Sequence, residues 1–296
     1  MRGALAIHPG ALGDVLLAVP ALRALRTRHG AVTLAAQRHI AALVAALGEA
    51  EVARDFDALR LETLFAGAGE AELPAAERVV CWFGARDVEF TRRLRAQARD
   101  AVVAPSTGTG LVWEHLLRTV GAAADDGRTP ARVGASLVAA GRAALVEAGW
   151  DGIQRLIVVQ PGAGSVRKCW PTEGFVAALG DLVESRELTA VLHEGPADAA
   201  AVDTLASGLP GALRLRAPAL PALAGVLRLA SVYVGNDSGV SHLAATVGAP
   251  AVVLFAVPNL AWRPWAAEPE VLEVSLSGVK WADVAAVRAA IRRRLG

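Results

Sequence analysis

Short apolar runs rich in β-branched residues alternate along the chain with longer segments whose apolar residues recur every three or four positions. The first pattern is typical of buried strands and the second of amphipathic helices. In the first half, the strand-like runs lie at residues 3–8, 31–37, 78–83 and 100–105, and helical segments lie at residues 21–28, 38–47, 87–98 and 111–120. This alternation predicts an α/β fold, with a parallel sheet covered by helices on both faces.

The pattern starts again after a helical segment at residues 136–148. Residues 156–164 (LIVVQPGAG) echo residues 5–13 (LAIHPGALG), because each is a buried strand that ends in Pro-Gly-Ala. Strand-like runs then alternate with helical segments at residues 172–185, 197–206 and 220–229. Two similar α/β halves in tandem are the prediction.

We place the N-terminal domain at residues 1–150 and the C-terminal domain at residues 151–279. In open parallel sheets, ligands bind beyond the carboxyl ends of the strands, so we expect the site in a cleft between two facing sheets. Residues 280–296 form an amphipathic helical segment. We expect this last helix to pack back on the N-terminal domain.

Residues 235–255 (GNDSGVSHLAATVGAPAVVLF) have the pattern of a strand end, a turn, a helix and a strand. A helix that begins at Ser238 or Gly239 directs unpaired backbone N–H groups and the positive end of its dipole at the turn, where an anion can bind. His242 lies one turn later, on the same face as Ser238. Asp237 and Ser238 are also ordinary helix caps, and that alternative stays open. The hydrolase pattern G-x-S-x-G does not fit around Ser238.

The composition excludes several classes of protein. With 54% hydrophobic residues, the chain still has no uninterrupted apolar run near the ~20 residues of a membrane span. His8 and Asp14 interrupt the apolar start, so we interpret the N-terminus as mature fold rather than as a signal peptide. A net charge of +1 argues against a nucleic-acid partner. Cys81 and Cys169 lack CxxC spacing, which is typical of a reducing cytoplasm and gives no metal site.

Three charged residues follow predicted strands and are candidates for chemistry. Asp14 can act as a general base at the end of the first strand, or simply cap the next helix. Lys168, beside Arg167, occupies the matching loop of the second half, where a cation can neutralise phosphate. Glu194 can accept hydrogen bonds from the hydroxyls of a ribose. For Lys168, Arg167 and Glu194, the alternative is that they are ordinary surface charges.

Two further patterns are interpreted as coincidences. Asp55-Phe-Asp57 has the D-x-D form of metal-dependent glycosyltransferases, but no convincing strand precedes it. Gly108-Thr-Gly110 and Gly162-Ala-Gly164 each begin a dinucleotide fingerprint, but Trp113 and Arg167 occupy the position of the third glycine. We therefore expect neither a metal nor NAD.

Taken together, three motifs resemble glycosyltransferase family 9, the ADP-heptose:lipopolysaccharide heptosyltransferases. The first is HPGALGDVLLAVPAL at residues 8–22, with Gly-Asp before an apolar run to proline. The second is Pro161-Gly-Ala-Gly-Ser165 followed by Lys168-Cys-Trp170-Pro171. The third is Gly-Asn-Asp-Ser-Gly-x-x-His-Leu-Ala-Ala at residues 235–245. The motifs span both halves in the family's order, and their co-occurrence is much more specific than any one of them.

The resemblance implies a GT-B fold, with two Rossmann-like domains and the nucleotide-sugar donor held mainly by the second. It implies inverting, metal-independent transfer of heptose from ADP-heptose to a lipopolysaccharide core or another lipid-linked saccharide, without a cofactor. Asp14 would be the catalytic base. The residues that would bind the donor are Ser165, Lys168, Glu194, Asp237, Ser238, Gly239 and His242. Such an enzyme would be cytoplasmic, with peripheral contact with the inner membrane surface as a further expectation.

The sequence departs from the family's pattern in two places. Ala256 stands where the family usually has glycine, and Val257-Pro-Asn replaces its polar continuation. The chain is also short for the family, mainly in the first half, where the acceptor would bind. Two alternatives therefore stay open, namely a GT-B glycosyltransferase or epimerase that uses another nucleotide sugar, and a sugar-nucleotide-binding protein without catalysis.

Overall fold

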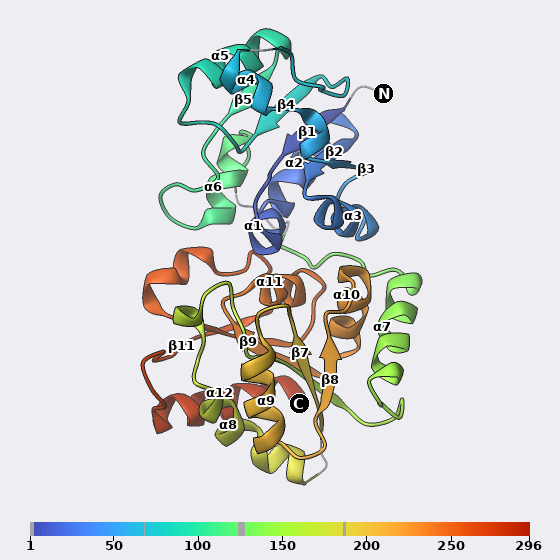
Figure 1. Ribbon diagram of the computed structural model, residues 1–296, viewed down its shortest axis with the longest axis vertical. Coiled ribbons are helices and arrows are strands. Elements are labelled where there is room, and N and C mark those ends of the chain that lie inside the picture. The colour runs from blue at the N-terminus through green and yellow to red at the C-terminus, as the bar shows by residue number, and fades with distance from the viewer. Residues whose placement is uncertain (1–2, 68, 124–127, 186–187) are drawn as a thin grey trace. The chain divides into compact units, whose positions relative to one another are not determined.

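The computed structural model describes residues 3–67, 69–123, 128–185 and 188–296. The chain forms two compact units, an N-terminal unit of Met1–Ala131 and a C-terminal unit of Arg132–Gly296. Each unit contains one parallel β-sheet with helices on its faces (Figure 1). The predicted α/β class and the prediction of two α/β halves in tandem are therefore confirmed.

The N-terminal sheet has five parallel strands in the order β3-β2-β1-β4-β5. The strands are β1 (Ala4–Ile7), β2 (Val32–Ala36), β3 (Val52–Asp55), β4 (Arg78–Cys81) and β5 (Ala101–Val103). The α-helices of this unit are α1 (Leu12–Leu17), α2 (Val19–His29), α3 (Arg38–Ala46), α4 (Glu62–Ala66), α5 (Val88–Gln97) and α6 (Val112–Thr119). β1 is buried along its whole length because helices cover both faces of the sheet.

The C-terminal sheet has six parallel strands in the order β11-β10-β9-β6-β7-β8. The strands are β6 (Leu156–Gln160), β7 (Thr189–Glu194), β8 (Leu213–Arg216), β9 (Val232–Asn236), β10 (Ala251–Phe255) and β11 (Glu270–Glu273). The α-helices are α7 (Ala135–Glu147), α8 (Thr172–Glu184), α9 (Ala199–Gly208), α10 (Leu220–Leu229), α11 (Gly239–Thr246) and α12 (Trp281–Leu295). Every residue of β6, β9 and β10 is buried, which makes these central strands the core of the unit.

The strand order gives each sheet a point at which the connections change direction. β1 pairs with both β2 and β4, and β6 pairs with both β7 and β9. After β6 the chain builds β7 and β8 on one side, and then returns to build β9, β10 and β11 on the other. At the carboxyl edge, the loop after β6 therefore leads toward one side of the sheet and the loop after β9 toward the other. This arrangement is the usual place for a ligand in an open α/β sheet.

The two units divide before α7, whereas the sequence placed the boundary at residue 150. α7 packs along α10 within the C-terminal unit (Figure 1). Gly141 of α7 and Gly225 of α10 allow this close approach, because a Cβ on Gly141 would lie 2.3 Å from the backbone carbon of Gly225. A helix that is held so closely belongs to the unit that it packs against.

The last helix, α12, is anchored in the C-terminal unit. Its buried residues belong to the core of the C-terminal unit, where the helix contacts α8, β9 and β10. These buried residues are Val284, Val287, Ala290 and Ile291. Their spacing of three or four residues forms the apolar face that the sequence showed, and that face is covered by its own sheet.

Two other local details differ from the sequence expectations. The first helix was expected at residues 21–28, but α1 already begins at Leu12. β3, which ends at Asp55, was missed. It is a four-residue strand with the sequence Val-Ala-Arg-Asp and with partly exposed side chains, so it lacks the apolar run that marked the other strands. Across the described ranges, no helix has both the length and the hydropathy to span a membrane.

Candidate functional site

The candidate site of the C-terminal unit lies at the carboxyl edge of β6 and β9. These strands are neighbours, with Gln160 paired to Gly235. The next residue, Asn236, is fully buried and connects the two loops. Its Oδ1 accepts the Trp170 N–H at 2.9 Å, and its Nδ2 donates to the Pro161 carbonyl at 2.6 Å. The segment from Pro161 to Trp170 is therefore fixed at both ends by one side chain.

The helix predicted at Ser238 or Gly239 begins at Gly239, as expected. Ser238 is its N-cap, with Oγ accepting the Ser241 N–H at 3.3 Å. The Ser241 hydroxyl in turn donates to the Asn236 carbonyl at 2.6 Å and lies 2.7 Å from the buried Tyr233 hydroxyl. The first turn of α11 is thus held rigidly against β9. Its remaining N–H groups direct the positive end of the helix dipole at the loop.

Lys168 and Asp237, which are 69 residues apart in the chain, meet at this helix start. The Lys168 Nζ lies 2.8 Å from Asp237 Oδ2. The Asp237 side chain is 6% exposed and that of Lys168 is 37% exposed, so the carboxylate is covered while the ammonium faces solvent. An ammonium has three N–H donors, and one contact to Asp237 leaves the others available to an anion. The structure brings together these two predicted residues.

His242 lies behind this pair in an almost fully buried position. Burial of the ring lowers the pKa of His242 to about 4. The nearby Asp237 carboxylate opposes this shift and the Lys168 ammonium adds to it. The imidazole is therefore neutral near pH 7. Its Nε2 lies 4.0 Å from Asp237 Oδ1, and its Nδ1 has no hydrogen-bond partner within the part of the chain that the structure describes. A neutral ring can form a hydrogen bond with a ligand, but it cannot neutralise the negative charge of a phosphate.

Ser165 lies in the same loop as Lys168, at an exposed position. It is the N-cap of the short 3-10 helix Val166–Lys168, and its Oγ accepts the Arg167 N–H at 3.3 Å. The turn presents Lys168 on a segment already anchored by Asn236. Ser165 thus has a local structural role, and this role is compatible with the donor contact that the family resemblance implies.

Glu194 lies at the carboxyl end of β7, as predicted, but it has basic neighbours that the sequence did not indicate. Its Oε2 lies 3.6 Å from the Arg216 Nε and 3.9 Å from an Arg214 guanidinium nitrogen, both on β8. Its side chain is only 18% exposed. The two arginines thus hold this carboxylate in place at the sheet edge.

Asp198 is a site residue that the sequence analysis missed. Its Oδ2 accepts hydrogen bonds from Gln160 Nε2 at 2.9 Å and from the Gly195 N–H at 3.1 Å. A Cβ on Gly162 would lie 1.8 Å from Asp198 Oδ1, so this position in the loop requires glycine. The carboxylate therefore reaches from the β7 loop to the β6 loop. A Gly-Pro turn followed by Asp before a helix was the available signal, but such turns are common.

A buried histidine completes this connection between β6 and β7. His193 Nδ1 forms a hydrogen bond with Gln160 Oε1, and Gln160 continues it to Asp198. Burial lowers the pKa of His193 to about 4, against the opposing effect of the Asp198 carboxylate. The neutral ring supports Gln160 without adding charge to the edge.

In the N-terminal unit, Asp14 lies in the first turn of α1 rather than at the end of the strand. Its Oδ2 accepts the Ala11 N–H at 3.0 Å. The capping interaction that was one alternative for Asp14 is therefore present. Capping and a catalytic role are compatible for this residue, because a hydrogen-bonded carboxylate can still accept a proton.

The Asp55-Phe-Asp57 segment does follow a strand, which corrects the reason for setting it aside. Asp55 is the last residue of β3, and its Oδ2 accepts the Arg38 Nε–H at 3.0 Å. Its Oδ1 lies 3.4 Å from the Asp57 backbone nitrogen. These contacts give the Asp55 carboxylate a structural role. Among the described residues, no group of three or more His, Cys, Asp or Glu side chains is arranged to hold a metal ion.

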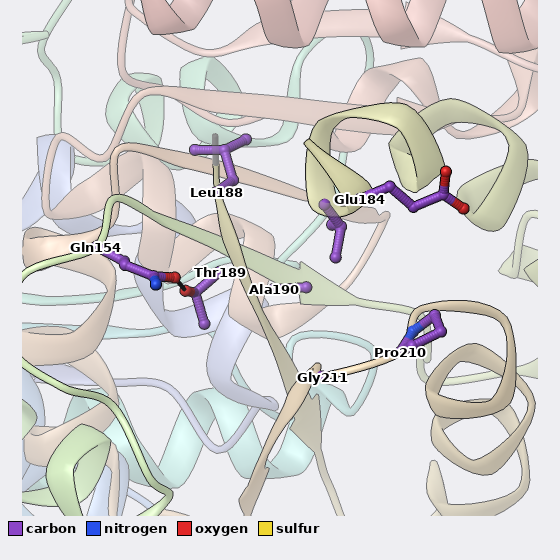
Figure 2. A pocket seen from close by; sticks show the side chains of 8 residues that line it. Gln154, Glu184, Leu188, Thr189, Ala190, Pro210 and Gly211 are labelled. Carbon is purple, nitrogen blue, oxygen red and sulfur yellow. Dashed lines mark hydrogen bonds between the residues drawn. The ribbon is translucent and has the colours of Figure 1, made fainter. Parts of the chain in front are cut away.

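A hollow of about 380 Å³ lies at the opposite edge of the C-terminal sheet (Figure 2). Gln154 precedes β6, Thr189 begins β7, and Gly211 precedes β8, so these lining residues belong to the amino ends of the strands. The side chains of Gln154 and Thr189 form a hydrogen bond there. None of the residues predicted for the donor site lines this hollow, and it is separate from the candidate site.

Comparison with known proteins extends this description. Residues 128–280 match the model of glycosyltransferase family 9 (heptosyltransferase). A lipopolysaccharide heptosyltransferase 3 of Escherichia coli is 34% identical over 118 residues, and this match covers 38% of the chain and 34% of the relative. The chain thus matches about a third of the length of that relative.

Solved structures resemble the whole chain. A family 9 glycosyltransferase from Veillonella parvula has a TM-score of 0.75 at 16% identity, covering 99% of this chain and 97% of that one. E. coli ADP-heptose lipopolysaccharide heptosyltransferase II has a TM-score of 0.73 at 17% identity and full coverage of both chains. E. coli heptosyltransferase WaaC with ADP has a TM-score of 0.69 at 18% identity, covering 99% of this chain and all of that one. These likenesses confirm the GT-B fold.

Proposed function

The chain belongs to glycosyltransferase family 9 (heptosyltransferase), and from this membership we propose that it transfers heptose from ADP-heptose to a lipopolysaccharide core or a related lipid-linked glycan. The observation that carries the proposal is the meeting of Lys168 and Asp237 at the N-terminus of α11. This arrangement has the charge and the backbone donors that a departing diphosphate requires.

The donor's diphosphate is proposed to bind between Lys168 and the first turn of α11. Breaking the bond to the sugar leaves negative charge on a diphosphate oxygen. The α11 N-terminus carries roughly half a positive charge. Lys168 adds an ammonium on an anchored loop, with its charge partly offset by the Asp237 carboxylate 2.8 Å away. Both are in place before the reaction, so they stabilise the charge as it develops. We propose that this arrangement makes a divalent metal unnecessary.

The carboxylates at the end of β7 are proposed to bind hydroxyl groups of the donor. Glu194 and Asp198 accept hydrogen bonds only, which suits the hydroxyls of a ribose. Glu194 is held by Arg214 and Arg216, and Asp198 by Gln160, so both have fixed positions. Ser238, Gly239 and His242 complete the proposed donor site around the helix start.

Asp14 is proposed as the general base. It takes the proton of the acceptor hydroxyl, whose oxygen attacks the anomeric carbon while the bond to the diphosphate oxygen breaks. A single displacement of this kind inverts the anomeric centre. The products are the glycosylated acceptor and ADP, and the proton stays on Asp14 until it passes to solvent.

The test supplies ADP-heptose and a lipopolysaccharide acceptor that lacks heptose, with EDTA present, and follows ADP release together with the mass and anomeric configuration of the product. We expect acceptor-dependent ADP release and inversion, with loss of activity in Lys168→Ala. The matched control is Lys280→Ala, because Lys280 is the chain's other lysine and is exposed. Donor consumption without an acceptor would instead support an epimerase or hydrolase, and binding without turnover a non-catalytic protein.

The donor sugar needs its own comparison because the departure from the family's pattern lies beside β10. The 3-10 helix Val257–Trp262 follows that strand, and Val257 is exposed. A panel of nucleotide sugars therefore tests which sugar and base are preferred. We further propose that the protein works at the cytoplasmic face of the inner membrane, where the acceptor would be presented, and co-sedimentation with anionic vesicles tests this contact.

A further inference from the structure

The turn between β1 and α1 is built around Gly10. A Cβ at Gly10 would lie 2.7 Å from the Asp14 Cβ and 2.7 Å from the His8 Cε1. Gly10 is therefore enclosed between the His8 ring and the Asp14 side chain. Any side chain at this position would displace one of the two, so the positions of His8 and Asp14 are coupled through the turn.

His8 forms the fixed side of this arrangement. It is 2% exposed, and its backbone N–H donates to the Ala35 carbonyl at 2.9 Å, as a continuation of the β1–β2 pairing. Its ring packs on Trp82, with 5.7 Å between the ring centroids. The His8 Nδ1 accepts the Gly10 N–H at 3.2 Å. The buried imidazole thus holds the turn through its hydrogen bond with the Gly10 N–H.

The protonation state of His8 follows from the same contacts. Burial lowers the pKa of His8 to about 4, so the ring is neutral near pH 7. Because Nδ1 accepts a hydrogen bond, the neutral ring carries its proton on Nε2. The Nε2 has no hydrogen-bond partner among residues 3–67, 69–123, 128–185 and 188–296. A buried polar atom of this kind costs free energy, which a leucine of similar size would avoid.

The residue after Gly10 connects the turn to Asp14. Ala11, the residue after Gly10, donates its N–H to Asp14 Oδ2. Gln37 Nε2 lies 3.3 Å from the Gly10 carbonyl and supports the turn from the end of β2. Successive backbone N–H groups of one short turn are therefore bound by His8 and by Asp14.

We propose that His8 is a positioning residue for Asp14, and that its neutral imidazole fixes the turn whose next N–H orients the Asp14 carboxylate. This inference rests on the proposed role of Asp14 as the general base. A neutral group is suited to the task, because a cation at this position would attract the carboxylate and weaken it as a base. A ring that only filled the core would not need its Nδ1 acceptor.

The test compares His8→Leu with His8→Asn in the transfer assay. Asn keeps an acceptor atom at the δ position, whereas Leu keeps only the volume. We expect kcat to fall about 10- to 100-fold in His8→Leu, as for a catalytic group misplaced by about 1 Å, and to stay within about 3-fold of wild type in His8→Asn. ADP binding, which belongs to the C-terminal unit, should stay unchanged in both. His29→Leu, at the opposite edge of the same unit, is the control for loss of a histidine.

A second readout does not depend on turnover. Hydrogen exchange of the Gly10 and Ala11 amides, measured by NMR, should accelerate in His8→Leu and remain as in wild type in His8→Asn. Equal exchange in all three proteins would overturn the positioning role, and so would equal loss of kcat in the two variants. If wild type has no transferase activity, the proposed function fails, and the exchange data still decide whether His8 fixes the turn.

Discussion

The two units place a Pro-Gly-Ala turn after the first strand of the sheet, and the two turns carry opposite charges. In the N-terminal unit the turn leads at once into α1, whose first turn contains Asp14. In the C-terminal unit a longer loop with a 3-10 helix comes first, and it carries Lys168. The same backbone start therefore supports a carboxylate in one unit and an ammonium in the other. The segment before the next α-helix is also longer in the C-terminal unit, where α8 begins at Thr172.

His8, directly after β1, and Gln160, the last residue of β6, form different contacts. His8 binds the Gly10 N–H of its own turn, whereas Gln160 reaches sideways to His193 and Asp198 of the β7 region. The N-terminal turn is thus held by His8 of its own segment and by Gln37 after β2, whereas the C-terminal edge is held by a series of side chains between β6 and β7. A site that binds a large charged donor benefits from the second arrangement, because more than one loop must keep its position.

The largest expected effect is on kcat and comes from changing Asp14 in the N-terminal turn. Asp14→Asn should lower kcat by about 10²- to 10⁴-fold, the usual contribution of a general base, while the affinity for ADP stays unchanged. Steady-state kinetics and calorimetry of the same variant measure the two quantities. Asp57→Asn, at an exposed carboxylate, is the control. A comparable loss in that control would mean that the Asp55-Phe-Asp57 segment takes part in the reaction.

The next effect concerns the C-terminal turn. Lys168→Met keeps much of the side-chain volume but removes the charge, and we expect kcat to fall about 10²- to 10³-fold, as when one preorganised donor is lost. The Asp237 carboxylate would also lose its partner. The double variant Lys168→Met/Asp237→Asn should therefore be more stable than Lys168→Met but no more active. Restored activity in the double variant would show that Lys168 serves only to neutralise Asp237.

The cross-linking of the C-terminal edge can be tested at Asn236. Asn236→Ala leaves the buried Trp170 N–H and Pro161 carbonyl without their partner and should lower the free energy of unfolding by about 1–3 kcal/mol. Urea unfolding monitored by tryptophan fluorescence measures the change. Asn259→Ala is the matched control, since it removes an asparagine from a 3-10 helix after β10. Equal stability of the two variants would contradict the anchoring role.

The smallest expected effect compares the units in mild acid. His8, His193 and His242 have folded pKa values of about 4 against an ordinary value of 6.5, so protons bind the unfolded chain first as the pH falls. Each histidine then removes about 1 kcal/mol of stability between pH 7 and pH 5.5. The C-terminal unit has two of them and the N-terminal unit one. Hydrogen exchange, corrected for its intrinsic pH dependence, should show the greater loss of protection in the C-terminal unit, and an equal loss would refute this difference.

The sequence predicted the elements that are long and strongly patterned. β6, β9 and β10 are continuous apolar runs because helices cover both of their faces, and the start of α11 followed from Ser238 and Gly239. β3 was missed, since an edge strand with exposed side chains has no such run. The boundary before α7 depends on the close contact of Gly141 with Gly225, which no local pattern encodes.

The candidate site was predictable to a similar degree. Lys168 and Asp237 were recognised from their motifs, but their contact depends on the pairing of β6 with β9 across a long stretch of chain. Asp198 was missed because its importance depends on Gln160 and Gly162 of another loop. The arginines beside Glu194 come from β8, and their proximity to it is likewise set by strand order. Tertiary neighbours of this kind cannot be read from spacing alone.

The most direct test of the donor site is calorimetric binding of ADP, GDP, UDP and CDP in EDTA to wild type, Lys168→Ala and Lys280→Ala. We predict preferential binding of ADP to wild type without a metal, clear weakening in Lys168→Ala, and no change in Lys280→Ala. Failure of every nucleotide to bind, a requirement for a divalent metal, or equal affinity in Lys168→Ala would contradict a diphosphate site at the N-terminus of α11.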